Sequence, residues 1–412
     1  MSRIEVHAQW EGMNDPSRVG LLDVEKARNQ EVVSFEYDKL WLSSSNQLLD
    51  PNLQYYTGKF FPKSGAENFS MFLDSSPSEW GRMLHTKYEQ VLARKQKREV
   101  RKLSSGDFLL RVFDYYRQGA LRFRTDVNVE FETTDEQFFL PTIASLKELE
   151  RASFICANEH PNDKDFVPAI EALIHPGGAL GGQRPKVNVI DDEWQMWMAK
   201  FPAPNDSHDM GGWEFVAHTL AGLAGINTSA IQIKKLNTQH HTFLSQRFDR
   251  NMKGERIHFA SAMTLLGYNS ERDPLSRASY LNLAEFLMRH GSDVNRDLEE
   301  LWRRIVFNIA IRNTGDHLRN HGFLLNDRGW TLSPAFDLNP TGGESLALNI
   351  SENDSMCDYD LAMSVAPYFR ITDAKAKSII NITKVTVGQW RKVAADAGIV
   401  KAEIEGMRSV FE

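Results

Sequence analysis

A polar loop and the hairpin predicted after it hold the residues best suited to chemistry in this sequence. Asp316, His317 and Asn320 lie in the loop, which follows an apolar stretch with helical spacing. Two strand-like runs, GFLL and WTLS, flank the turn-forming residues 326–329 and lead to Asp337. Because a hairpin folds its two ends together, Asn320 and Asp337 are expected to meet. One carboxylate and one amide oxygen suit a hard divalent cation that takes its other ligands from water and substrate phosphates.

The order of these residues carries more information than any one of them. Asp316 lies close enough to Asn320 in the chain to face a transferring phosphate. An acid, an amide, a hairpin and a second acid follow one another in the catalytic loop of protein kinases. A single Asp or Asn would indicate only a turn. The ordered set at the end of an apolar helix favours a site for a metal ion and phosphates.

A second polar segment, GGALGGQRPKVNV, lies upstream. Gly181 and Gly182 precede an alternating strand that starts at Lys186, and glycine lets backbone N–H groups approach phosphates closely. Lys200 ends the next apolar strand, where an unpaired ammonium would be costly to bury. It therefore either reaches water or binds an anion. Glu214, in the first turn of the next helix, is either its partner or a favourable acid at a helix N-terminus.

The elements that must position these residues change in type along the chain. Residues 1–60 are predicted to form short strands, in the runs RIEVHAQW, VGLLDV, VVSFEYD and KLWLS. A basic run between Arg94 and Lys102, predicted to be helical, is either a nucleic-acid contact or, as we favour, a solvated helix face. From residue 259 onward the pattern is mostly helical.

A strand-rich half followed by a helix-rich half predicts an α+β, two-lobed fold like that of protein kinases. Three domains are expected. Residues 1–135 would form a strand-rich subdomain with the basic helix, and residues 136–250 a lobe with the glycine-rich turn and Lys200. Residues 251–412 would form a helical lobe with the catalytic loop and the metal-binding Asp337.

Composition and charge argue against several classes of protein. The 412 residues carry a formal net charge of −7, which argues against coating nucleic acid by bulk charge. The two cysteines, Cys156 and Cys357, offer no zinc framework and fit a reducing compartment. The N-terminus lacks an apolar leader, and no apolar run is long enough to span a bilayer. A cytoplasmic protein that does not enter the membrane is expected.

Seven motifs, spanning about residues 75–340, resemble the HipA-type serine/threonine kinases, the toxin components of bacterial toxin–antitoxin pairs. They are WGRMLHTKYE, RQGALRFR, GGQRPKVNV, MAKFPAP, SQRFDR, DHLRNHGFLL and WTLSPAFDLNP. The resemblance implies ATP and Mg²⁺ as cofactors. It also implies phosphorylation of a cytosolic protein, in the best-known case an aminoacyl-tRNA synthetase. The partner would be a small helix-turn-helix antitoxin, through which alone the chain would reach DNA.

The resemblance also assigns roles to individual residues. The predicted ATP-binding residues are Gly181, Gly182, Lys186, Lys200, Gln246 and Phe248. The catalytic residues would be Asp316 and His317, and the magnesium ligands Asn320 and Asp337. Phe248, expected beside the adenine, has ordinary core packing as its alternative.

Two departures from the family pattern bear on activity. The family's loop carries its catalytic Asp two residues before the histidine, where this chain has Gly315. The adjacent Asp316 could replace it only if the loop shifted by about one residue, ~3.5 Å of chain, and a ~1 Å misplacement can cost ~100-fold in rate. The segment 176–186 also lacks the serine that autophosphorylates in many members.

Three functions therefore stay open. The first is an ATP- and Mg²⁺-dependent serine/threonine protein kinase, active or weakened. The second is a pseudokinase that binds nucleotide and regulates a DNA-binding antitoxin. The third is a kinase of a small molecule or lipid, with a lipid disfavoured because no membrane anchor is expected.

Overall fold

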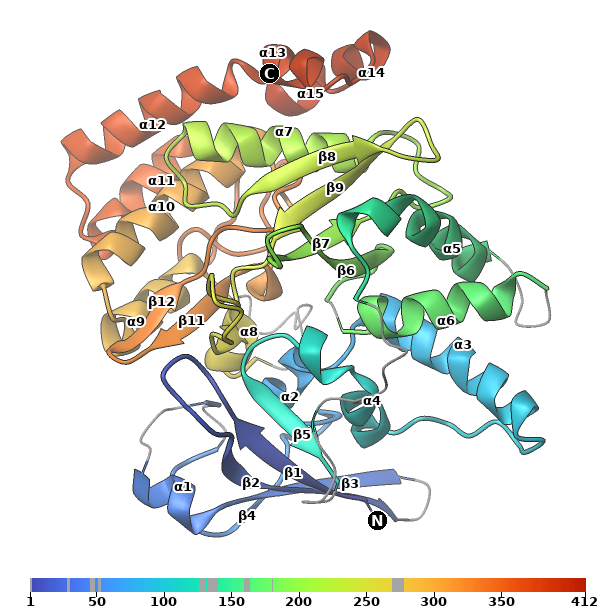
Figure 1. Cartoon of the computed structure of the whole chain (residues 1–412). Helices are drawn as coiled ribbons and strands as arrows, with labels where there is room; N and C mark the ends of the chain where they lie inside the picture. Colours follow the sequence, from blue (N-terminus) through green and yellow to red (C-terminus); the bar gives the residue numbers. More distant parts are fainter. Residues whose placement is uncertain are drawn as a thin grey trace. The chain divides into compact units, whose positions relative to one another are not determined.

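The computed structural model describes residues 2–27, 30–44, 49–50, 53–125, 131, 140–158, 164–179, 181–268 and 278–412 (Figure 1). The chain forms two compact units. Unit 1 comprises Met1–Asn205 and Asp249–Ala260, and unit 2 comprises Asp206–Phe248 and Ser261–Glu412. The three predicted domains are divided differently and stay a prediction. The first of their boundaries, after residue 135, lies outside the described residues.

Unit 1 begins with a five-stranded antiparallel sheet in the order β4-β3-β2-β1-β5 (Figure 1). Its strands are β1 (Ser2–Ala8), β2 (Ser17–Ala27), β3 (Gln30–Tyr37), β4 (Lys59–Phe60) and β5 (Leu121–Arg124). Ile4, Leu22 and Phe35 lie opposite one another across three strands, and all three are fully buried. The pairing of β1 with β2 and of β2 with β3 confirms the first three predicted strands.

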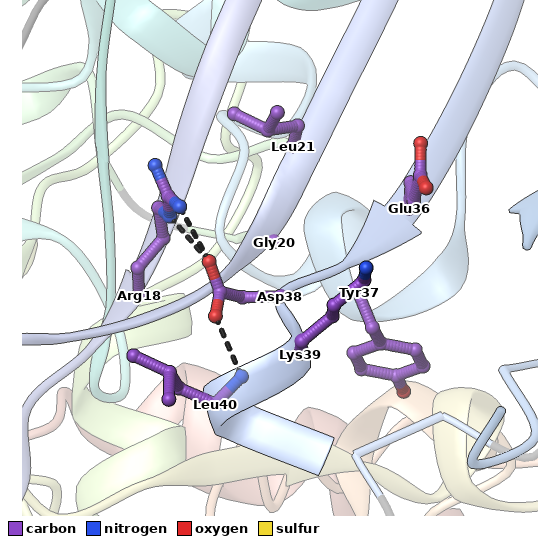
Figure 2. Close-up of a pocket in the computed structure, with 8 residues that line it drawn as sticks. All are labelled: Arg18, Gly20, Leu21, Glu36, Tyr37, Asp38, Lys39 and Leu40. Carbon is purple, nitrogen blue, oxygen red and sulfur yellow. Dashed lines mark hydrogen bonds and ion pairs between the residues drawn. The ribbon is translucent and has the colours of Figure 1, made fainter. Parts of the chain in front are cut away.

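The fourth predicted strand, KLWLS, is wrong, because these residues form helix α1 (Lys39–Ser44). Asp38 starts the helix by accepting a hydrogen bond from the Leu40 backbone N–H at 2.8 Å, and it is held in turn by Arg18 (Figure 2). Trp41 is the buried residue of the helix, whereas Leu40 is 78% exposed. An acid that bonds to the backbone two residues onward favours a turn or helix start over a strand.

Unit 1 continues with helices around a second hairpin. They are α2 (Ser70–Asp74), α3 (Glu79–Lys95), α4 (Ser105–Arg111), η1 (Asp114–Tyr116), η2 (Ile143–Ser145), α5 (Leu146–Asn158) and α6 (Phe166–Gly177). The hairpin consists of β6 (Lys186–Ile190) and β7 (Met196–Lys200), which pair antiparallel. β10 (Phe259–Ser261) crosses from unit 1 into unit 2.

The basic run lies mostly after α3, which ends at Lys95, and not within a helix as predicted. Arg98 and Arg111 each donate to the fully buried carboxylate of Glu89 at 2.6 Å, and Arg101 lies 3.8 Å from it. Burial alone would raise the pKa of Glu89, but these hydrogen bonds outweigh burial and lower the pKa to about 2. Part of the run therefore serves to neutralise a buried acid.

Unit 2 is mostly helical. Its early elements are α7 (Met210–Leu223), β8 (Ile231–Lys235), β9 (His241–Gln246), α8 (Ala262–Leu265), α9 (Tyr280–His290) and α10 (Val294–Ile311). The central ones are η3 (Leu318–Asn320), β11 (Gly322–Asn326) and β12 (Gly329–Leu332). The last are α11 (Tyr359–Val365), η4 (Ala366–Phe369), α12 (Asp373–Val387), α13 (Trp390–Asp396), α14 (Lys401–Gly406) and α15 (Arg408–Phe411).

The core of unit 2 joins α7 and α10 to the C-terminal helices. Trp213, Val216 and Leu220 of α7 form one buried cluster with Phe307 of α10 and Trp390 of α13. The combination of a strand-rich start and a helical C-terminal part confirms the predicted α+β class. In the described part of the chain, no helix is both long enough and apolar enough to cross a membrane.

Candidate active site

The hairpin predicted in unit 2 is present. β11 and β12 pair antiparallel from Phe323 opposite Leu332 to Asn326 opposite Gly329. The ladder extends past the strand ends, because the Ser333 N–H donates to the Gly322 carbonyl at 2.9 Å. The segments that leave the two strands, which carry Asn320 and Asp337, therefore start side by side.

The same two segments are joined again farther from the hairpin. The Thr314 backbone N–H donates to the Thr341 hydroxyl at 3.0 Å, and this hydroxyl donates to the Arg312 carbonyl at 3.0 Å. Asn320 lies between Thr314 and the start of β11, and Asp337 lies between the end of β12 and Thr341. The structure thus holds their two segments together at both ends.

Asn320 is oriented by its own loop. Its side-chain N–H donates to the Gly315 carbonyl at 3.2 Å, so the amide oxygen points away from that carbonyl. His317 precedes the short helix η3, and its carbonyl accepts the Asn320 backbone N–H at 2.8 Å. An amide whose nitrogen is engaged in the loop presents its oxygen, which is the atom a hard cation binds.

Asp337 has an unusual backbone conformation, with φ of 57°. Positive φ is uncommon for residues other than glycine, although Asp and Asn tolerate it best, and such conformations cluster at functional sites. Its neighbours fix it in place: Ala335 and Leu338 belong to the core of unit 2, and Asn339 donates to one Asp337 oxygen at 3.3 Å. The half-buried carboxylate is therefore held by the packing on both sides of it.

Asp316 lies in a different environment and is only 3% exposed. Its Oδ2 accepts hydrogen bonds from the Tyr280 hydroxyl, from the Asn308 side-chain N–H at 2.7 Å and from the His321 Nε2–H at 2.9 Å. Burial would raise the pKa of Asp316, but His321 and Tyr280 outweigh it and hold the pKa below its usual value. This geometry favours a structural part for Asp316 over the predicted part as proton acceptor, because the side chain is buried and three protein donors bind one of its two oxygens.

Gly315, at the position of the family's catalytic Asp, is exposed. A Cβ added there would meet no atom within 4 Å, and its backbone lies outside the left-handed region. The backbone at this position therefore accepts a Cβ without rearrangement.

The residues predicted to bind phosphates lie in unit 1. Lys186 and Lys200 are direct partners across the β6–β7 hairpin and are only 4% and 7% exposed. Lys186 donates to the Gly181 carbonyl, and Gly182 has φ of 86°, with no room for a Cβ beside the Lys186 ammonium. The two glycines therefore surround the Lys186 side chain. Because Lys186 pairs with Lys200, one hairpin carries two cationic groups.

The first two glycines of this segment have another function. Gly177 is the last residue of α6, and Gly178 caps it, whereas Leu180 lies outside the described residues. The start of α3 holds the remaining turn: the Ser78 hydroxyl donates to the Gly182 carbonyl at 2.8 Å, and the Trp80 indole N–H donates to the Lys186 carbonyl at 3.1 Å. Sequence reasoning missed these contacts, although Trp80 begins the first of the seven motifs.

The predicted adenine segment returns to unit 2. Gln246 ends β9, and its backbone N–H donates to the Ala230 carbonyl at 2.9 Å. Phe248 is half-buried and packs on Phe336, with ring centroids 5.6 Å apart. Because Phe336 immediately precedes Asp337, the structure brings the adenine segment next to the metal segment.

The predicted site residues are thus divided between the units. Unit 1 holds Gly181, Gly182, Lys186 and Lys200, and unit 2 holds Gln246, Phe248, Asp316, His317, Asn320 and Asp337. Among the described residues, no group of three or more His, Cys, Asp and Glu side chains could hold a metal ion. One carboxylate and one amide still fit Mg²⁺, which keeps several waters and relies on substrate phosphates.

A hollow of about 400 Å³ by the N-terminal sheet, lined by Arg18, Asp38 and their neighbours, contains none of the predicted residues (Figure 2).

A solved structure of another protein has the same fold as this chain. The HipA chain from Shewanella oneidensis MR-1, solved with HipB and its operator DNA, matches with a TM-score of 0.67 and 15% identity. The match covers 99% of this chain and 95% of that one. The Helicobacter pylori proinflammatory kinase CtkA gives a TM-score of 0.35 at 14% identity, over 55% of this chain and 92% of its own. The second value is too low to support an argument.

A comparison with curated proteins found no match. A family model, described as the HipA-like C-terminal domain, matches residues 178–391, which is more than half of the chain. The matched range includes both the lysine hairpin and the loop with Asn320 and Asp337. This chain therefore belongs to the HipA-like family.

Proposed function

We propose that this chain binds Mg–ATP and is a serine/threonine protein kinase of the HipA type whose phosphate transfer is weakened at Gly315. The observation that carries the proposal is Asp337, held with positive φ in a segment tied at both ends to the loop of Asn320. Asn320 and Asp337 would hold Mg²⁺, which neutralises charge on the phosphates when bound.

The nucleotide's phosphates would also be bound from unit 1. Lys200 and Lys186 supply two positive charges from neighbouring strand positions, and Gly181 and Gly182 allow the backbone to approach closely. Phe248 would lie against the adenine ring.

The proposed kinase lacks the family's proton acceptor. Gly315 has no side chain to take the proton of a substrate hydroxyl, and Asp316 is buried with three protein donors on its Oδ2. A positioned acid or base contributes about 10²–10⁴-fold to such reactions. The burial of Asp316 therefore favours the second candidate function as well, in which the chain binds nucleotide and acts as a regulatory partner with little turnover.

Restoring the carboxylate tests the proposal. Because space is open at this position, we expect Gly315→Asp to raise transfer of label from γ-labelled ATP to cytosolic bacterial proteins by about 100-fold or more. Gly315→Asn is the matched control, since it adds a similar volume without a charge. Equal labelling by Gly315→Asp, Gly315→Asn and the parent chain would contradict a kinase weakened at this position.

We propose a small helix-turn-helix antitoxin as the partner, with DNA reached only through it. The Shewanella HipA structure supports this, because that protein was solved in complex with HipB and operator DNA. The substrate would be a cytosolic protein, with an aminoacyl-tRNA synthetase as the first to examine. Co-expression with a candidate helix-turn-helix antitoxin and size-exclusion chromatography would test the partnership, and separate elution of the two proteins would count against it.

A further inference from the structure

We propose that Asp316 is a positioning residue that anchors residues 313–321 and thereby aims the Asn320 amide oxygen at the metal. The inference rests on the proposed function for its metal ion. It assigns the loop's buried acid a part distinct from proton transfer.

Three separate elements hold the Asp316 carboxylate. Tyr280 starts α9, Asn308 lies in the last turns of α10, and His321 follows η3. Each donates to the same oxygen, Oδ2. Burial and the adjacent Asp316 raise the pKa of Tyr280 well above its usual value, so its hydroxyl remains a donor. The Asp316 Oδ2 atom thus connects the loop to α9, to α10 and to His321 at the end of the same loop.

The anchor reaches Asn320 through one short path. Gly315 precedes Asp316 directly, and the Gly315 carbonyl accepts the Asn320 side-chain N–H at 3.2 Å. On the other side, the Asn313 side chain donates to Asn308 at 3.1 Å, so the same α10 residue holds both ends of this turn. A shift of Asp316 would move the Gly315 carbonyl and with it the orientation of the amide.

Groups that orient a metal ligand affect metal affinity without touching the ion. Their mutation costs about 10- to 100-fold in metal affinity in well-studied sites. We therefore expect the anchor to set how much Mg²⁺ is needed for ATP binding. Binding of metal-free ATP should not depend on it.

The test uses two anchor variants and one matched control in the full chain. Asp316→Asn removes the charge with little change in volume, and Tyr280→Phe removes one donor in case the first variant folds poorly. The control is Asp297→Asn. Asp297 is also a buried carboxylate, 2% exposed, but it accepts hydrogen bonds from Thr331 and the Leu332 backbone, within β12.

Two readouts are measured on each variant. The first is backbone hydrogen exchange of residues 313–321 without ligand, which should quicken in Asp316→Asn and Tyr280→Phe and stay at the parent rate in Asp297→Asn. The second is ATP binding by calorimetry across a Mg²⁺ titration. The Mg²⁺ concentration for half-maximal binding should rise about 10- to 100-fold in Asp316→Asn, and less in Tyr280→Phe.

The outcomes separate the positioning role of Asp316 from the proposed nucleotide binding. Parent-like loop exchange in both anchor variants, or a Mg²⁺ requirement that shifts equally in Asp297→Asn, overturns the positioning role. If the parent chain binds no ATP at any Mg²⁺ concentration, the proposed function fails and the inference about the amide fails with it. Faster loop exchange in that case would leave Asp316 a purely structural anchor.

Discussion

The polar segments of the two units are built in opposite ways. In unit 2, Asp316 is surrounded by donors from two helices and its own loop, and nearby polar groups bond to one another. In unit 1, the β6–β7 register puts Lys186 directly opposite Lys200, so two cationic side chains lie on one pair of strands.

This difference separates what each unit should contribute to a bound nucleotide. Unit 1 offers positive charge, which acts on phosphates with or without a metal. Unit 2 offers oxygen ligands, which act only through a metal. The contributions can therefore be told apart by measuring ATP binding in Mg²⁺ and again in a chelator.

The largest effect is expected at the metal ligand. Asp337→Ala should weaken ATP binding in Mg²⁺ by about 30-fold or more, since losing one partner of a close charge pair costs roughly 2–5 kcal/mol. Binding in a chelator should stay within about twofold, because the carboxylate repels rather than binds bare phosphates. Calorimetry measures both. Asp327→Ala, at an exposed acid in the turn of the same hairpin, is the control and should match the parent. Equal losses with and without Mg²⁺ would show that Asp337 does not act through a metal.

A smaller effect is expected at the lysine hairpin. Lys200→Met keeps most of the buried stem but removes the charge, and hydrogen bonds to charged groups contribute about 1.5–3 kcal/mol. ATP binding should fall by about 10- to 100-fold both in Mg²⁺ and in a chelator. The exposed Lys253, also in unit 1, provides the control variant Lys253→Met. A loss confined to Mg²⁺ would remove the contrast between the two units.

The smallest effect is expected in the aromatic pair. Phe248→Leu should weaken binding of both ATP and adenosine by about 2- to 10-fold, because aromatic pairs contribute about 0.5–1.5 kcal/mol beyond burial. Adenosine binding should not respond to Lys200→Met. Phe215→Leu, at another half-buried phenylalanine of unit 2, controls for packing. Unchanged adenosine binding with a lowered melting temperature would make Phe248 an ordinary core residue.

Local patterns predicted the hairpin of unit 2 well. The turn at residues 326–329 and the alternation on either side of it are contiguous in sequence, so their pairing needs no distant partner. The strand predicted for KLWLS was wrong because that prediction also rested on the local pattern alone. Three apolar residues in a row fit a strand or a helix, and the deciding group was the acid before them, Asp38.

Contacts between distant residues could not be predicted. Asp316 is adjacent to the expected catalytic position, but its partner Tyr280 lies 36 residues away in the chain. The Ser78 hydroxyl that holds Gly182 lies 104 residues from it. Residue type and spacing indicated that these segments belong to a functional site. Only the packing of the folded chain determines that Asp316 is buried and that the Gly182 carbonyl accepts a hydrogen bond.

The most direct test is a crystal structure of the full chain with Mg²⁺ and a non-hydrolysable ATP analogue. We expect Mg²⁺ at about 2.0–2.1 Å from the Asn320 amide oxygen and an Asp337 carboxylate oxygen, with phosphate oxygens and waters as its remaining ligands. The Lys200 ammonium should lie within hydrogen-bond distance of the phosphates. A bound analogue whose metal touches neither Asn320 nor Asp337 would contradict the proposed site.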